Sequence, residues 1–186
     1  MALLEIETKY PVTDHAPFLA QIQKWGAKKL EDREDSDLYF NAPDRDFAST
    51  DEAFRLRRIG ERNCLTYKGP KRDLETKTRL EIEVPFADGS ANGEDLARLL
   101  QHLGYRSVAV VHKFRTVYEL IQKGYHLHVC FDDVTEVGKY LEVEIVAEEA
   151  EFEKAKKVLL EVAAEMGLKE SERRSYLSML LGKKKI

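Results

Sequence analysis

The sequence has little cysteine and no long hydrophobic run. Its only two cysteines, Cys64 and Cys130, stand far apart and form no C-x-x-C pair, which predicts ordinary reduced thiols of a cytosolic protein. No run of about eighteen apolar residues occurs, and no apolar leader precedes the first strand pattern. We therefore expect a cytoplasmic protein without a membrane segment.

The sequence also lacks a dominant charge. It has 34 acidic residues against 30 lysines and arginines, which gives a formal net charge of −4. Because so small an excess provides little bulk attraction, nucleic acid and anionic membranes are not the expected partners. The 186 residues, 43% of them apolar, suffice for a sizeable core. We expect a single domain spanning residues 1–186.

Strand patterns dominate what is present. Alternation with period two predicts eight strands, mostly joined as hairpins, at residues 2–10, 37–40, 53–59, 63–68, 76–85, 108–121, 125–133 and 139–146. Helical spacing of apolar residues predicts helices between residues 13 and 26, from about 93 to 102, from 149 to 166, and a short one near 176–181. The fold class is therefore α+β.

Charged residues of one sign recur at every second position of several strands. These positions share one face of their strand, and apolar residues occupy the opposite face. The acidic pairs are Glu5 and Glu7, Glu81 and Glu83, and Glu142 and Glu144; the basic pairs are Arg55 and Arg57, and Lys113 and Arg115; Lys9, Lys68 and Asp132 extend the set. A solvent face explains any one strand, but a solvent face tends to mix signs because like neighbours repel.

Closure of the sheet accounts for the whole set. In a closed eight-stranded antiparallel β-barrel, the charged faces line the interior and the helices pack outside on the apolar faces. Buried charges are costly unless they are paired or bind something charged, so we expect a ligand. Carboxylate oxygens suit Mg²⁺ or Mn²⁺, and six basic residues suit a polyanion such as a triphosphate.

The ordered motifs resemble the CYTH, or triphosphate tunnel metalloenzyme, superfamily. They are the E-x-E-x-K that begins at Glu5, the R-x-R at Arg55, "TYKGPK" around Lys68, the E-x-E at Glu81, the K-x-R at Lys113 and the final E-x-E at Glu142. This resemblance spans nearly the whole chain. The stretches "DSDLYF", "KGPK", "FDDV" and "SYLSMLL" further resemble the class IV adenylate cyclase branch.

The resemblance implies a tunnel that binds triphosphates with Mg²⁺ or Mn²⁺, often in a homodimer. It implies catalytic roles for Glu5, Glu7, Lys9, Glu142 and Glu144, of which the four glutamates would hold metal. It implies that the phosphates bind Lys9, Arg55, Arg57, Lys68, Lys113 and Arg115. Glu81, Glu83 and Asp132 would bind a second metal, orient a nucleophile or anchor the basic residues.

Several functions are compatible with these residues. Hydrolysis of ATP, thiamine triphosphate or tripolyphosphate is preferred, since authentic cyclases of this fold carry an aromatic pair before the first acidic motif and "MALLE" has none. Cyclisation of ATP to cyclic AMP and pyrophosphate is the alternative, and a non-catalytic polyphosphate or nucleotide sensor is the second. An RNA 5′-triphosphatase would need an external basic surface. A zinc pair at His126 and His128 lacks a third nitrogen or sulfur ligand.

Overall fold

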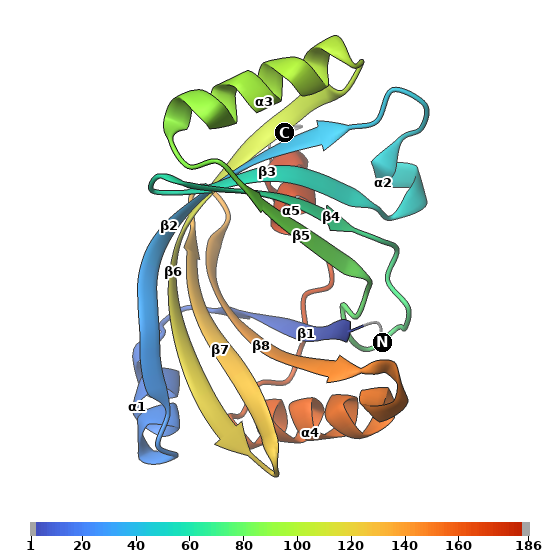
Figure 1. Cartoon of the computed structure of the whole chain (residues 1–186). Helices are drawn as coiled ribbons and strands as arrows, with labels where there is room; N and C mark the ends of the chain where they lie inside the picture. Colours follow the sequence, from blue (N-terminus) through green and yellow to red (C-terminus); the bar gives the residue numbers. More distant parts are fainter. Residues whose placement is uncertain (1–2, 184–186) are drawn as a thin grey trace.

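The computed structural model describes residues 3–183 of the chain (Figure 1). Its strands are β1 (Leu3–Val12), β2 (Lys28–Asn41), β3 (Ala53–Ile59), β4 (Arg62–Lys68), β5 (Glu81–Phe86), β6 (Arg106–Gln122), β7 (Tyr125–Val134) and β8 (Gly138–Glu148). Its helices are α1 (Ala16–Lys24), α2 (Phe47–Thr50), α3 (Ser90–His102), α4 (Phe152–Glu165) and α5 (Tyr176–Lys183), with a 3₁₀ turn at Glu149–Glu151. Residue 2, where the first strand was predicted to begin, lies outside the described residues.

All eight strands form one antiparallel sheet in the order β1-β8-β7-β6-β2-β3-β4-β5. The sheet curls strongly (Figure 1), which confirms the α+β class and the eight antiparallel strands. The prediction of a closed barrel is wrong. The edge strands β1 and β5 form no ladder with each other; an isolated bridge between Glu5 and Arg79 and a 2.8 Å hydrogen bond from Lys77 N to Glu7 O join the two edges.

The segment before β5 explains why β5 starts late and does not form a ladder with β1. The carboxylate of Asp73 accepts hydrogen bonds from the backbone N–H groups of Glu75 and Thr76, both at 2.7 Å. Such side-chain turns compete with ladder formation, so the strand predicted at 76–85 begins only at Glu81. At the other side of the molecule β2 is much longer than the predicted 37–40, because it starts at Lys28.

The main hydrophobic core lies outside the curled sheet rather than within it. Helix α4 covers the outer faces of β1 and β8 (Figure 1), where Leu159 and Val162 pack with Ile6, Val143 and Ile145. Burying a side chain of this size stabilises a fold by about 1.5–3 kcal/mol. The apolar alternation of the strands is therefore satisfied by helices, as predicted, and the concave face is left to the charged residues.

Two smaller clusters fix helices α3 and α5. Leu96 and Leu100 of α3 pack on Leu56 of β3, and Met179 of α5 packs on Val111 of β6. Among the described residues, no helix combines the length and the hydropathy that crossing a membrane requires.

Candidate active site

The concave side of the sheet encloses a charged cavity of about 340 Å³. Its walls include all of the predicted site residues except Lys9 and Asp132: Glu5, Glu7, Arg55, Arg57, Lys68, Glu81, Glu83, Lys113, Arg115, Glu142 and Glu144. These residues come from six strands, and period-two alternation directs each of them to the same side of the sheet. The structure thus brings together residues that are up to 139 positions apart in the sequence, the separation of Glu5 and Glu144.

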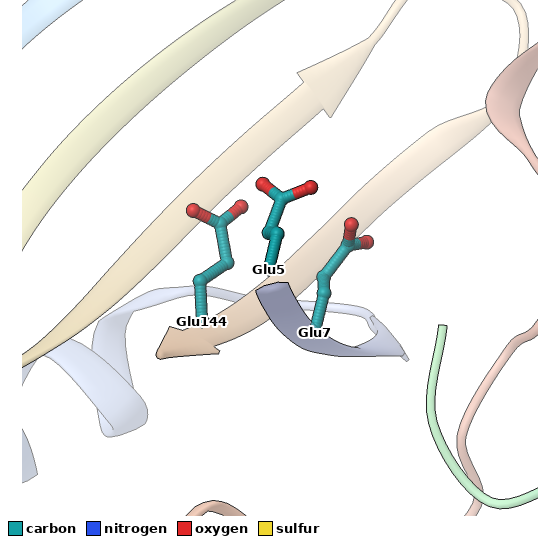
Figure 2. A group of neighbouring side chains, drawn as sticks. All are labelled: Glu5, Glu7 and Glu144. Atoms are coloured by element: carbon teal, nitrogen blue, oxygen red, sulfur yellow. The ribbon is translucent and has the colours of Figure 1, made fainter. Parts of the chain in front are cut away.

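Three carboxylates from two neighbouring strands converge in this cavity. Glu5, Glu7 and Glu144 each place one oxygen within 4.8 Å of the others (Figure 2), and Glu7 of β1 is paired in register with Glu144 of β8. Burial raises the pKa of Glu5. Burial and the neighbouring carboxylates also raise the pKa of Glu144 to about 8, against the opposing charge of Arg115. The cluster therefore repels itself and favours a cation among its oxygens.

The donor set of this acidic cluster fits a hard divalent cation. Three carboxylate groups offer oxygen ligands only, which is the chemistry that Mg²⁺ and Mn²⁺ prefer over zinc or copper. Of the two histidines that could form a zinc pair, His126 is exposed and contacts Glu119 at 3.1 Å, and neither belongs to the cluster.

Two lysines neutralise part of the acidic cluster. Lys68 Nζ lies 2.9 Å from Glu5 and 2.5 Å from Glu81, and Lys77 Nζ pairs with Glu7 and lies 3.7 Å from Glu142. Although burial alone would lower it, the two glutamates hold the pKa of Lys68 above its ordinary value. Lys77 was not among the predicted site residues, although the structure brings it to β1, where its backbone N–H donates to Glu7 O at 2.8 Å.

Arg115 connects the acidic cluster with a buried anchor. Its Nε and Nη2 donate to the two oxygens of Asp132 at 2.7 and 2.6 Å, Nη2 also bonds Glu142, and Nη1 lies 3.4 Å from Glu144. Asp132 is fully buried and accepts a further hydrogen bond from Tyr176 Oη at 2.7 Å. The structure thus places Asp132 behind Arg115 rather than on the cavity wall.

Glu142 differs from the three clustered carboxylates. Burial alone would raise its pKa, but Arg115 and Lys77 hold the pKa of Glu142 well below the ordinary value. Its charge is therefore already balanced by two cations. The metal-binding role that was predicted for Glu142 stays a prediction. Glu144 of the same strand, in contrast, belongs to the acidic cluster of Glu5, Glu7 and Glu144.

The basic wall is held in place by two aspartates of β2 that sequence reasoning missed. Asp37 accepts hydrogen bonds from Nε and Nη2 of Arg57 at 2.7 and 2.8 Å and from Arg55 at 3.2 Å. Lys113 Nζ lies 3.2 Å from Asp35, whose buried oxygens form ion pairs rather than aligned hydrogen bonds. Although burial alone would raise it, Arg55 and Arg57 hold the pKa of Asp37 far below its ordinary value.

Lys9 and Glu83 occupy the limits of the predicted site. Lys9 is fully buried; its Nζ donates to Arg174 O at 2.5 Å and lies 4.0 Å from the ring centre of Tyr176. Burial and the charge of Lys77 lower the pKa of Lys9 to about 7. Glu83 is exposed and accepts a hydrogen bond from Thr66 at 3.2 Å. Its place on the exposed rim separates it from the three clustered carboxylates.

Comparison with known proteins assigns this arrangement to a family. The model of the CYTH domain matches residues 3–176, a range that contains every residue of the charged cavity. The chain belongs to the CYTH domain family. This membership confirms the resemblance that the ordered charged motifs predicted, and within the family the chain is similar to proteins with adenylate cyclase names.

Two relatives and two solved structures illustrate the similarity. A protein of Methanocaldococcus jannaschii, named as a candidate adenylate cyclase, is 33% identical over 180 residues, covering 95% of this chain and 98% of the relative. Adenylate cyclase CyaB of Aeromonas hydrophila is 27% identical over 182 residues, covering 94% and 87%. The structure of the PH1819 protein of Pyrococcus horikoshii matches with a TM-score of 0.83 and 35% identity, covering 96% and 99%.

The second structure, of a Hippeastrum protein, has 17% identity and a TM-score of 0.68, with 97% of this chain and 96% of that chain covered. Its description reports a candidate adenylyl cyclase with a dominant triphosphatase activity. At this identity the likeness concerns the fold alone. It shows that the overall fold recurs in the Hippeastrum protein.

Proposed function

We propose that this chain is a divalent-metal-dependent enzyme that hydrolyses a phosphoanhydride bond of a triphosphate. The observation that carries the proposal is that one cavity is lined by both an acidic cluster and a group of basic residues. Glu5, Glu7 and Glu144 form an acidic cluster on β1 and β8, and Arg55, Arg57, Lys113 and Arg115 line the same cavity from β3 and β6. A volume of about 340 Å³ falls within the range of small-molecule sites.

The acidic cluster would hold Mg²⁺ or Mn²⁺ through the carboxylates of Glu5, Glu7 and Glu144. When bound, the metal supplies Lewis-acid neutralisation of phosphate charge. Lys68 and Lys77, which pair with these carboxylates, also line the charged cavity and would bind phosphate oxygens.

The basic residues of this chain bind and orient the triphosphate. Arg57 and Arg115 are already fixed by buried aspartates, so their guanidinium groups are preorganised to stabilise negative charge as it develops. In hydrolysis, the oxygen of water forms a bond to the terminal phosphorus while the bond from that phosphorus to the bridging oxygen breaks. The electron pair leaves with the diphosphate, and the proton of water passes to solvent.

Cyclisation of ATP is a second candidate, and the names of the relatives from Methanocaldococcus jannaschii and Aeromonas hydrophila favour it. There the ribose 3′-oxygen attacks the α-phosphorus and pyrophosphate leaves. Hydrolysis is placed first because the stretch before the first acidic motif, "MALLE", lacks the aromatic pair that cyclases of this fold carry. A sensor that binds a polyanion without turnover has no use for the three clustered carboxylates.

Product analysis tests the proposal. The protein is incubated with ATP, thiamine triphosphate and tripolyphosphate, each with Mg²⁺, with Mn²⁺ or with EDTA, and phosphate, pyrophosphate and cyclic AMP are resolved by chromatography. We expect metal-dependent release of phosphate. Formation of cyclic AMP and pyrophosphate would contradict hydrolysis and support the cyclase function. Tight binding without turnover of any substrate would support the sensor. A homodimer and a cytoplasmic location remain predictions.

A further inference from the structure

Arg33 of β2 is a basic residue of the charged cavity that the ordered sequence motifs do not include. Its side chain lines the cavity. On β2 it precedes Asp35 and Asp37 on the same face of the strand, because side chains alternate with period two. In the register of the sheet Arg33 is paired with Arg115 of β6. The cavity wall on β2 therefore contributes a guanidinium of its own.

Arg33 shares one buried carboxylate with two other cations. Asp35 is 1% exposed, and its oxygens lie 3.0 Å from Arg33 Nε, 3.2 Å from Lys113 Nζ and 3.5 Å from Arg57 Nη2. The three cations all line the charged cavity. Since a single carboxylate cannot neutralise three cations, this group retains positive charge on the cavity wall.

The further partners of these cations do not remove the excess charge. Arg57 shares Asp37 with Arg55. Arg33 also pairs with Glu31, but the side chain of Glu31 is 33% exposed and pairs with Arg62 as well, at 3.3 Å. Ion pairs in contact with water are weakened by solvent and salt. The group around Asp35 is therefore suited to attract an anion inside the cavity.

The hydrogen-bonding capacity of Arg33 is only partly used. Its Nη1 donates to Glu31. Within residues 3–183 its buried Nε has no aligned hydrogen bond, and neither do the two oxygens of Asp35. The contact between Arg33 and Asp35 is thus mainly an attraction of charges. Because a guanidinium has five N–H donors in a planar arrangement that matches phosphate, Arg33 has donors left for phosphate oxygens.

The place of Arg33 along β2 indicates which phosphate it would contact. Arg55 is paired in register with Tyr39 of β2. Arg33 lies six residues earlier on the same face, which corresponds to about 20 Å along the strand. The phosphate that contacts Arg33 is therefore a different one from the phosphate nearest Arg55, and it lies at an end of the chain of phosphates.

We propose that Arg33, together with Lys113 and Arg57 around Asp35, binds an end phosphate of the triphosphate and makes the cavity selective for three phosphates over two. This inference rests on the proposed function, because the phosphates must occupy the charged cavity. A diphosphate leaves the position at Arg33 empty. Arg33 is thus a specificity-determining residue that reads the length of the phosphate chain.

Equilibrium binding of two phosphonates tests the role of Arg33. The probes are methylenediphosphonate and bis(methylene)triphosphonate, in which CH₂ replaces each bridging oxygen, so that hydrolysis does not consume them. Calorimetric titration with Mg²⁺ present gives each dissociation constant. We expect the wild type to bind the triphosphonate at least about tenfold more tightly. Arg33→Gln should weaken triphosphonate binding about tenfold and leave diphosphonate binding within about twofold.

Two control variants separate Arg33 from its ion pair with Glu31. Arg62→Gln removes the other arginine that pairs with Glu31, and Arg62 is exposed and lies outside the cavity wall. Both dissociation constants should stay within about twofold of the wild type. Glu31→Gln removes the carboxylate but leaves the guanidinium of Arg33 in place, so triphosphonate binding should not fall.

A third variant keeps the test decisive if Arg33→Gln does not fold. Arg33→Lys preserves the positive charge beside Asp35 but removes the planar set of donors. We expect it to weaken triphosphonate binding about threefold and to leave diphosphonate binding unchanged. If only this variant folds and it binds both probes as the wild type does, the role of Arg33 is refuted.

The outcomes distinguish the inference from the proposed function. Unchanged triphosphonate binding in Arg33→Gln, equal losses for both probes, or equal affinity of the wild type for both probes overturns the selectivity role of Arg33 and leaves the proposed function standing. Failure of the wild type to bind either probe overturns the proposed function as well. A loss confined to the triphosphonate, at an unchanged melting temperature, supports the inference, because a merely structural role would not depend on chain length.

Discussion

The guanidinium of Arg115 is clamped by Asp132 through two parallel hydrogen bonds, from Nε at 2.7 Å and from Nη2 at 2.6 Å. Asp132 has no exposed surface, and the hydroxyl of Tyr176 holds its second oxygen. The pair thus ties the cavity wall to helix α5, so that the position of a phosphate-binding group depends on the C-terminal part of the chain.

Asp132→Asn should weaken both stability and substrate capture. Removing one partner of a buried ion pair costs about 3–5 kcal/mol, and Arg115 loses the anchor that orients it. We expect a lower free energy of unfolding in urea and a KM for triphosphate raised about tenfold or more. Asp133→Asn is the control, because Asp133 is the exposed neighbour on the same strand. Equal behaviour of the two variants would contradict the anchoring role.

Glu144→Gln should abolish stabilisation by metal. A ligand that binds only the folded state, and whose free concentration is about 100 times its dissociation constant, raises the free energy of unfolding by about 2.7 kcal/mol. We expect Mg²⁺ or Mn²⁺ to raise the melting temperature of the wild type and of Glu148→Gln, a change at an exposed position of the same strand. The Glu144→Gln variant should show little rise. A full rise in that variant would exclude Glu144 as a ligand.

Asp37→Asn should change how stability depends on pH. Arginines hold the pKa of Asp37 below its ordinary value of about 3.9, so this carboxylate stabilises the fold above that pH, and the stability is lost as pH falls through the folded-state pKa. Urea unfolding between about pH 7 and 3 should show a smaller decline in Asp37→Asn than in the wild type. Asp88→Asn, at an exposed position, should keep the wild-type slope.

Leu159→Ala should lower stability without changing substrate binding in the cavity. Leu159 of α4 is fully buried against the outer face of the sheet, and truncation at such a site costs about 2–5 kcal/mol. We expect a lower melting temperature with an unchanged KM at temperatures where the variant is folded. A KM that rises in parallel with the loss of stability would mean that the charged lining depends on this packing.

The sequence predicted the charged lining better than the shape of the sheet. Where apolar and charged residues alternate cleanly, as around Glu142 or Arg57, the period of two identifies the face. Asp35 and Asp37 were missed because the run "EDREDSD" carries charge on both faces and hides the alternation. Closure of the barrel could not be read from alternation, since that pattern identifies faces but does not show whether two edges meet.

Initial rates of phosphate release from triphosphates with Mg²⁺, compared between the wild type and Glu5→Gln, test the central claim most directly. Glu5 belongs to the acidic cluster and lies outside the apolar core, so the account predicts a loss of about 100-fold or more in turnover with a melting temperature close to that of the wild type without metal. Full turnover in Glu5→Gln together with a lower melting temperature would show that the clustered carboxylates are structural and would contradict the account.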